Sequence, residues 1–232
     1  MNVIPQAVKD GFVRLVGPIA RALIRWGVRP NVITTLGALV VLGSATAFGL
    51  GHAHLGGFLL LASGLFDILD GQVARQGTLS TAFGAFYDST LDRVGESAIF
   101  AGVMLSFLRG GLPSSQVPLG VMLAAVALAS SLLVSYTRAR AEGLGFDCKV
   151  GIAARAERFI VLGAPTLFFG AGSNGQLLFW IVAVLAAVTS ITVVQRVVYV
   201  ARVAGRAVSA TPATARGRRD TLPGHAALRK GT

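Results

Sequence analysis

Six apolar stretches, each about as long as a membrane-crossing helix, constrain the fold more than any other feature of the sequence. They occupy residues 32–51, 54–74, 82–107, 117–141, 156–172 and 177–201. A helix needs roughly 20 apolar residues to cross the hydrocarbon core of a bilayer. Only 13% of the 232 residues are charged, about half the share in an ordinary soluble domain. The sequence therefore predicts an all-α integral membrane protein with six transmembrane helices, and it excludes most soluble enzymes and disordered chains.

The two ends of the chain differ from this apolar centre. Residues 6–26 place apolar groups on one face at helical spacing and basic groups largely off it, which is typical of a helix on a membrane surface. A soluble amphipathic helix packed on a partner is the alternative. We expect three parts: an amphipathic juxtamembrane helix in residues 1–29, a six-helix domain in residues 30–203, and a basic disordered tail in residues 204–232.

The basic residues indicate how the chain is oriented. The chain has 21 Lys and Arg against 10 Asp and Glu, a net charge of +11. With six spans, nearly all of the Lys and Arg fall on one side and only Arg109 falls on the other. The positive-inside rule then predicts a protein of the cell membrane whose two termini both face the cytoplasm. Because the chain is so apolar, the positive charge favours anionic lipid or a phosphorylated substrate over nucleic acid.

Four aspartates stand where charge is costly, inside the apolar stretches. Asp67 and Asp70 are three residues apart near the end of the second stretch, and Asp88 and Asp92 are four apart early in the third. Each spacing puts a pair on one helix face. Because the intervening turn at residues 76–81 is short, we expect a helical hairpin that brings the two pairs together on the cytoplasmic side.

Carboxylates this close need cations, because neighbouring like charges oppose ionisation. Only Arg75 and Arg93 are near in sequence. Oxygen ligands without His or Cys favour Mg²⁺, Mn²⁺ or Ca²⁺, and four carboxylates suffice for two ions, as in phosphoryl chemistry. Buried acid–arginine pairs and a proton or cation transport relay are the alternatives. Gly71, which would let a phosphate approach the backbone, and Arg75, which could clamp it, favour a phosphate-bearing ligand.

Read whole, this stretch carries a pattern of eight fixed residues: Asp67-x2-Asp70-Gly71-x2-Ala74-Arg75-x8-Gly84-x3-Asp88-x3-Asp92. It resembles the signature of the CDP-alcohol phosphatidyltransferases at every fixed position. The resemblance implies a six-helix membrane enzyme, usually a homodimer, with its active site open to the cytoplasm. It also implies transfer of the phosphatidyl group of a CDP-linked lipid, such as CDP-diacylglycerol, to an alcohol, with release of CMP.

The resemblance also implies site residues. Two ions of Mg²⁺ or Mn²⁺ would be held by the four acids, Asp67, Asp70, Asp88 and Asp92, and Asp92 would also act as the general base. Contacts to the nucleotide and its phosphates would fall on Asn31, Thr34, Gly71, Arg75 and Thr81. Without the resemblance, Asn31, Thr34 and Thr81 are equally explained as helix caps.

The second half of the chain bears on the acceptor alcohol. Four arginines, Arg138, Arg140, Arg155 and Arg158, flank one predicted cytoplasmic loop, and Arg196 lies inside the last apolar stretch. A lone cation in an apolar run requires an anion, and a cluster of guanidinium groups suits a phosphorylated acceptor. The alternative is attraction of these arginines to lipid headgroups, above all for Arg140 and Arg158.

This half is similar to phosphatidylinositol-phosphate synthases and their archaeal ether-lipid relatives, which implies inositol 1-phosphate as the acceptor. The contacts to its phosphate would fall on Ser135, Arg138, Arg155 and Arg196. The chain departs from those relatives, which often carry Lys at the position of Arg138, and Glu and Pro at those of Ala154 and Ala156. Glycerol 3-phosphate is therefore the second candidate acceptor, and serine, which carries no phosphate, is less expected.

Overall fold

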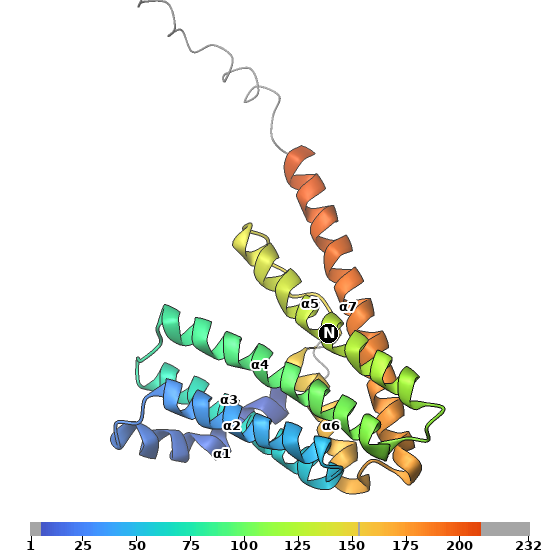
Figure 1. The fold of residues 1–232 in the computed structure, drawn as a ribbon. Helices are drawn as coiled ribbons and strands as arrows, with labels where there is room; N and C mark the ends of the chain where they lie inside the picture. Colours follow the sequence, from blue (N-terminus) through green and yellow to red (C-terminus); the bar gives the residue numbers. More distant parts are fainter. Residues whose placement is uncertain (1–5, 153, 210–232) are drawn as a thin grey trace, which may run out of the picture.

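The computed structural model describes residues 6–152 and 154–209, and all regular secondary structure in this part of the chain is helical (Figure 1). It contains the helices α1 (Gln6–Arg25), α2 (Pro30–Gly49), α3 (Ala53–Gln76), α4 (Ala82–Ser106), α5 (Val117–Gly143), α6 (Arg155–Phe169) and α7 (Gln176–Ser209). Two short helical turns, Phe107–Gly111 and Ser173–Gly175, precede α5 and α7. The predicted all-α class is confirmed, and most helix ends lie within a few residues of the predicted apolar stretches.

Local chemistry explains several helix boundaries. Gly27 has a φ of +70° after α1, a conformation that glycine adopts without strain. Pro30 then opens α2 at its first position, where its missing N–H is not needed. At the other end of the chain, α7 continues through residue 203 to Ser209. The remainder of the expected disordered tail, residues 210–232, lies outside the described residues.

Four helical segments of the described chain are long and apolar enough to cross a membrane: Pro30–Gly49, Ala53–Gln76, Val117–Gly143 and Ser173–Gly205. The other two predicted spans differ in character. Helix α4 carries four charged residues in its first 15 positions, and α6 has only 15 residues. Length and composition therefore support an integral membrane protein with these four candidate spans.

The helices pack into one bundle around a continuous apolar core. Helix α2 packs against both α3 and α4, α5 packs against α7, and α3 also contacts α1 and α6 (Figure 1). The core receives a fully buried side chain from each of five helices: Phe48, Leu60, Val103, Leu162 and Val182. A smaller cluster of Ala20, Ile33 and Val73 joins α1 to α2 and α3. The amphipathic N-terminal helix thus packs on the chain's own helices.

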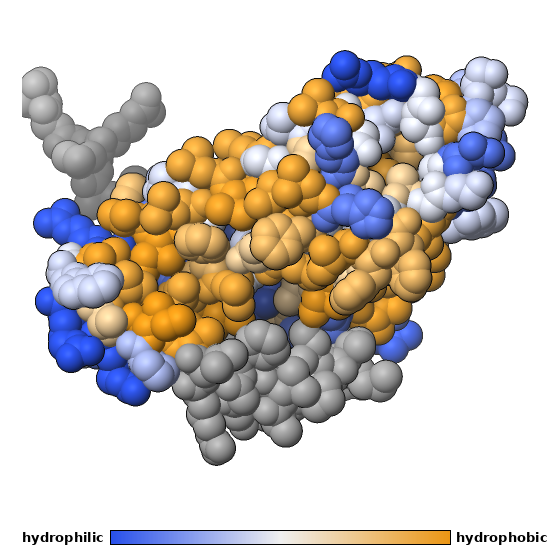
Figure 2. Space-filling view, turned by 90° about the horizontal axis from the view of Figure 1, so that it is seen from below, coloured by the Kyte–Doolittle hydropathy of each residue, from blue (hydrophilic) through white to orange (hydrophobic). Residues whose placement is uncertain are grey.

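The outer surface of the bundle is itself apolar. Large side chains such as Phe58, Phe168, Phe169 and Trp180 are more than half exposed. Figure 2 shows a face on which apolar residues cover a broad central area, while hydrophilic residues gather toward two ends. Exposed apolar area on this scale is typical of surfaces that contact lipid or a partner protein, which agrees with the predicted membrane setting.

Glycines let the helices approach closely, as small residues do in membrane proteins. A Cβ atom placed on Gly102 of α4 would lie 2.1 Å from the carbonyl oxygen of Ala45 in α2. One placed on Gly57 of α3 would lie 2.5 Å from Thr166 Oγ1 in α6. Both contacts are too short for any side chain. The separation of α4 from α2, and hence the position of the α4 acids, depends on Gly102.

We therefore expect Gly102→Ala to lower the free energy of unfolding by about 1–3 kcal/mol, the usual cost of overpacking. Gly64→Ala is the matched control, because nothing lies within 4 Å of a Cβ at this position, and there alanine favours the helix by roughly 0.5–1 kcal/mol. Unfolding of the two purified variants in detergent measures the difference. Equal stability of both variants would contradict the close α2–α4 contact.

Candidate active site

The four aspartates lie on α3 and α4, which a short turn connects as predicted, but the two helices do not pack against each other as the expected hairpin would; each packs against α2 instead. Asp70 and Asp88 line a small cavity of about 160 Å³. Asp67 and Asp92 instead share one arginine, Arg155 of α6. The acids are thus gathered as two pairs, and each pair takes one residue from α3 and one from α4.

The small cavity is built from α2, α3, α4 and the α3–α4 turn. It collects four of the five expected nucleotide contacts, namely Asn31, Thr34, Gly71 and Thr81. The fifth, Arg75, lies directly beside it, because its guanidinium nitrogens are 3.2 Å from the position of a Cβ on Gly71. The lack of a side chain at Gly71 therefore makes room for the Arg75 guanidinium at the edge of the cavity. Backbone, hydroxyl and guanidinium groups on one wall suit a phosphate-bearing ligand.

The structure shows which of the three candidate residues, Asn31, Thr34 and Thr81, cap a helix. Thr81 is the N-cap of α4, and its Oγ1 accepts a hydrogen bond from the Gly84 N–H at 2.9 Å. The N-cap of α2 is Arg29, which makes no side-chain cap. Asn31 and Thr34 therefore do not cap α2. Thr81 combines both interpretations, since it caps a helix and also lines the small cavity.

Thr34 has a role that the sequence did not reveal. Its hydroxyl donates to Asp70 Oδ2 at 2.8 Å and lies 3.1 Å from the carbonyl oxygen of Pro30. Both Thr34 and Asp70 are 8% exposed. A buried donor of this kind fixes the orientation of a carboxylate that is a candidate metal ligand. Thr34 therefore orients Asp70 in addition to lining the cavity.

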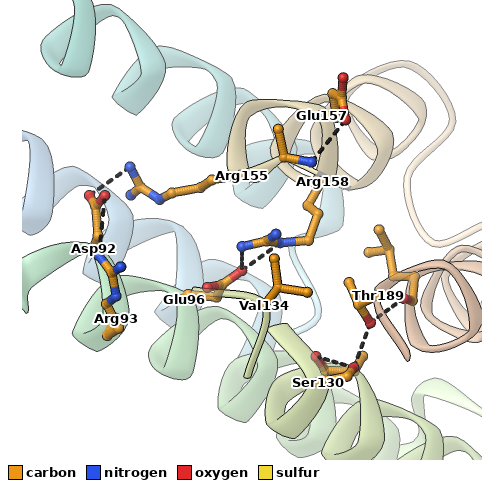
Figure 3. A network of polar contacts seen from close by, with 12 residues as sticks. Asp92, Arg93, Glu96, Ser130, Val134, Arg155, Glu157, Arg158 and Thr189 are labelled. Atoms are coloured by element: carbon orange, nitrogen blue, oxygen red, sulfur yellow. Dashed lines mark hydrogen bonds and ion pairs between the residues drawn. The ribbon is translucent and has the colours of Figure 1, made fainter. Parts of the chain in front are cut away.

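Arg155 provides the positive charge between the other two acids. Its Nη1 lies 2.6 Å from Asp67 Oδ2 and 2.6 Å from Asp92 Oδ1, and its guanidinium stands 4.6 Å above the ring centre of Phe159. Figure 3 shows Arg155 extending from α6 toward Asp92. The expected alternative of acid–arginine pairs is thus realised for Asp67 and Asp92. The arginine that forms them is 88 residues from Asp67, too distant for sequence spacing to indicate.

A second and larger cavity of about 360 Å³ opens beside this arginine. Its lining includes all four expected acceptor-phosphate contacts, Ser135, Arg138, Arg155 and Arg196, together with Asp92. These residues come from α4, α5, α6 and α7, so only the packed bundle brings them together. Arg138 pairs with Glu142 at 2.8 Å, and both side chains are about half exposed. An exposed pair of this kind is weak, so an anion in the cavity can compete for Arg138.

Arg196 is held by backbone carbonyl groups. Its Nε donates to Val150 O at 2.9 Å, its Nη1 donates to Val134 O, and the residue is 7% exposed. A Cβ on Gly151, which has a φ of +124°, would lie 2.6 Å from Thr192 Cγ2. Glycine therefore lets the α5–α6 loop pass close to α7 at this arginine. The carbonyls orient the guanidinium but do not neutralise its charge, so an anion in the cavity would still be attracted.

Arg158 does not fit the lipid-headgroup alternative. Its side chain is only 3% exposed and pairs with Glu96, so the alternative is wrong for this residue. Glu96 had no predicted role, although it stands one helical turn after Asp92 on the same face of α4. The i, i+4 spacing between Asp92 and Glu96 is the sequence signal that could have identified Glu96 as a residue of the site. Arg140, by contrast, is exposed.

The chemistry of the acids suits a hard divalent cation, because all of the candidate ligands are carboxylate oxygens. That Arg155 contacts Asp67 and Asp92 together shows that these two carboxylates face a common cation. Across residues 6–152 and 154–209, no three acidic, His or Cys side chains close around a single point. The fit therefore rests on the donor set and on the shared orientation of these carboxylates.

The chain is similar to proteins of one known family. Residues 27–192 match the family described as CDP-alcohol phosphatidyltransferase. The archaetidylinositol phosphate synthase of Methanothermobacter thermautotrophicus is 41% identical over 192 residues, which cover 81% of this chain and 89% of the relative. The phosphatidylinositol phosphate synthase of Cutibacterium acnes is 38% identical over 202 residues, which cover 84% of this chain and 96% of the relative.

Solved structures are also similar. The Mycobacterium tuberculosis phosphatidylinositol phosphate synthase with CDP-DAG bound superposes with a TM-score of 0.71 at 32% identity, covering 81% of this chain and 94% of that one. The same enzyme in complex with manganese and citrate gives a TM-score of 0.70 at 33% identity, covering 79% and 87%.

The hydrogen bond from Thr34 to Asp70 leads to a prediction about metal binding. Thr34→Val keeps the shape of the side chain but removes the donor, so we expect Mn²⁺ affinity to fall about 10–100-fold, as for other residues that orient a ligand. Isothermal titration of the purified protein with Mn²⁺ measures the change. Thr35→Val is the control, because Thr35 bonds to Asn31 O and the Tyr87 hydroxyl instead. Unchanged affinity in Thr34→Val would show that Asp70 needs no such support.

Proposed function

We propose that this chain, which belongs to the CDP-alcohol phosphatidyltransferase family, transfers the phosphatidyl group of CDP-diacylglycerol to inositol 1-phosphate. The products would be phosphatidylinositol phosphate and CMP. One observation carries the choice of acceptor: three arginines and a serine from α5, α6 and α7 line one cavity with Asp92. A cavity with this charge suits an acceptor that bears a phosphate. The names of the relatives agree with the choice.

In this proposal, each of the two cavities binds one of the two substrates. We place the nucleotide of the donor in the small cavity, beside Gly71, Arg75 and Thr81, and the acceptor in the large one. A relative of known structure binds CDP-DAG, which supports a donor site in the same fold. Asp92 lines the large cavity, and Asp70 and Asp88 line the small one. The reacting phosphorus would therefore lie between the two cavities, near the acids.

The chemistry then follows from the placement of the side chains. Asp92 accepts the proton of the acceptor hydroxyl, and the resulting oxygen attacks the lipid-linked phosphorus of the donor. The bond from that phosphorus to the oxygen of the CMP phosphate breaks, and CMP leaves with the electron pair. Arg155, Arg138 and Arg196 hold the acceptor phosphate, so that its hydroxyl is directed toward Asp92.

We propose that Asp67, Asp70, Asp88 and Asp92 hold two ions of Mg²⁺ or Mn²⁺. A structure of a relative contains manganese, which supports a divalent ion in this fold. Such ions would supply charge neutralisation for the pyrophosphate group of the donor. Asp92 would then serve both as a ligand and as the base.

The membrane arrangement is also part of the proposal. We infer that α4 and α6 complete a set of six spans, because both pack into the same apolar core as the four candidate spans. Both termini and the active site would face the cytoplasm, since the arginines of the large cavity belong to the predicted cytoplasmic side. By resemblance to its family, the chain would form a homodimer. Because the chain belongs to this enzyme family, the four aspartates no longer support the alternative of a metal or proton transporter.

The role of Asp92 can be tested by replacing its carboxylate. Asp92→Asn keeps the size of the side chain but cannot accept the proton, so we expect CMP release to fall at least about 100-fold while CDP-diacylglycerol still binds. CMP release and binding of the lipid to the purified variant measure the two effects. Asp147→Asn is the control, because this exposed carboxylate pairs only with Lys149 among the described contacts. Substantial residual turnover in Asp92→Asn would remove Asp92 as the base.

The acceptor can be tested at Arg196. Arg196→Gln keeps a donor for a backbone carbonyl but loses the charge, so we expect the KM for inositol 1-phosphate to rise about tenfold with little change in the KM for CDP-diacylglycerol. Arg202→Gln, at an exposed position of the same helix, is the control. The wild-type enzyme should release CMP with inositol 1-phosphate. Turnover with glycerol 3-phosphate, serine or free inositol instead would overturn the proposed acceptor.

A further inference from the structure

The buried ion pair of Arg158 and Glu96 lies next to the contact between Arg155 and Asp92. Arg158 Nε donates to Glu96 Oε1 at 2.8 Å, and Arg158 Nη2 lies 2.6 Å from the same oxygen. Each side chain is 3% exposed. Both residues line the large cavity, so the pair forms part of its wall (Figure 3).

The pair repeats the Asp92–Arg155 contact one helical turn further along both helices. Glu96 follows Asp92 by four residues in α4, and Arg158 follows Arg155 by three in α6. Residues at these spacings lie on one face of a helix. Two arginines of α6 therefore reach two acids of α4 side by side, and Figure 3 shows both contacts from the same viewpoint.

These side chains span a gap between the helices. The backbone of α6 packs against α3 and α7, whereas α4 packs against α2 and α5. Helix α6 reaches α4 through its long arginine side chains, and the cavity lies where the backbones stay apart. The length of an extended arginine side chain paired with a glutamate thus sets the distance between the two walls.

A buried ion pair is a poor source of stability. Its desolvation can outweigh its attraction, and well-packed apolar residues in its place are often equally stable. The attraction does, however, fix a geometry, because removing one partner leaves a buried charge without its counter-charge. This favours a role in geometry over one in holding the bundle together.

We propose that Glu96 and Arg158 are positioning residues, which hold α6 at the distance from α4 that places Arg155 at the acceptor cavity. This inference rests on the proposed function, because it assigns the effect to acceptor binding. Neither residue lines the small cavity, and α6 contributes none of the residues that line it. We therefore expect a disturbed pair to alter the large cavity and to leave the lining of the small cavity in place.

The test is a double-mutant cycle in the full-length protein, in detergent or lipid. The variants are Glu96→Gln, Arg158→Gln, and the two combined. We expect each single variant to raise the KM for inositol 1-phosphate at least about tenfold, with less than about a twofold change in the KM for CDP-diacylglycerol. In the double variant the two effects should not add, because either change breaks the same contact.

A second double variant distinguishes loss of positioning from unfolding of the protein. Glu96→Leu combined with Arg158→Met removes both charges and keeps an apolar interior, so we expect it to fold and to bind CDP-diacylglycerol normally while its acceptor KM stays raised. The control is Asp147→Asn combined with Lys149→Gln, which breaks an exposed pair and should change neither KM. Recovery of a normal acceptor KM in the apolar variant would show that the pair does not position Arg155.

Other outcomes also overturn the inference. If Arg158→Gln raises the acceptor KM but Glu96→Gln does not, Arg158 binds the acceptor phosphate directly. If Glu96→Gln lowers the acceptor KM, Glu96 only neutralises charge in the cavity. Equal rises in both KM values would show a general loss of structure. The proposed function is tested separately by wild-type turnover, and if another phosphorylated acceptor proves to be the substrate, the same cycle is measured with it.

Discussion

Placing carboxylates inside an apolar helical bundle is the constraint on which the rest of this structure depends. An ionised acid at membrane depth must face a cation, and the bundle supplies one to Asp67 and Asp92 through Arg155. This contact joins α3, α4 and α6 at a single point. Asp92 also lines the large cavity, and Asp70 and Asp88 line the small one, so acids that require a cation belong to the walls of both cavities.

The two cavities also draw mostly on different helices. Helices α2, α3 and α4 build the small cavity, which Asp70 and Asp88 line, whereas α5, α6 and α7 supply most of the arginines of the large one and α4 adds Arg93. Asp92 belongs to α4 and lines the large cavity. In the proposed assignment, the donor site therefore comes from one contiguous part of the chain, whereas the acceptor site also draws on the later helices.

The departures from the expected acceptor pattern fall in that second part. Ala154 lines the large cavity, and its backbone N–H donates to Glu157 Oε2 at 2.9 Å. Arg138 projects into the same cavity from α5. The cavity therefore stays cationic despite these substitutions, because Arg155 and Arg196 are held by contacts that do not involve the substituted side chains.

Local patterns in the sequence were enough to predict the helices and the two pairs of acids on α3 and α4, and the resemblance of the spaced motif to a known family implied the cytidine-lipid chemistry. Apolar periodicity and the i, i+3 and i, i+4 spacings are local properties, which neighbouring residues encode. Only the tertiary structure decided that Arg155 pairs with Asp67 and Asp92, that Thr34 orients Asp70, and that Arg158 is buried against Glu96. These partners lie 36 to 88 residues apart, and their meeting depends on how the helices pack, which periodicity along a single helix does not specify.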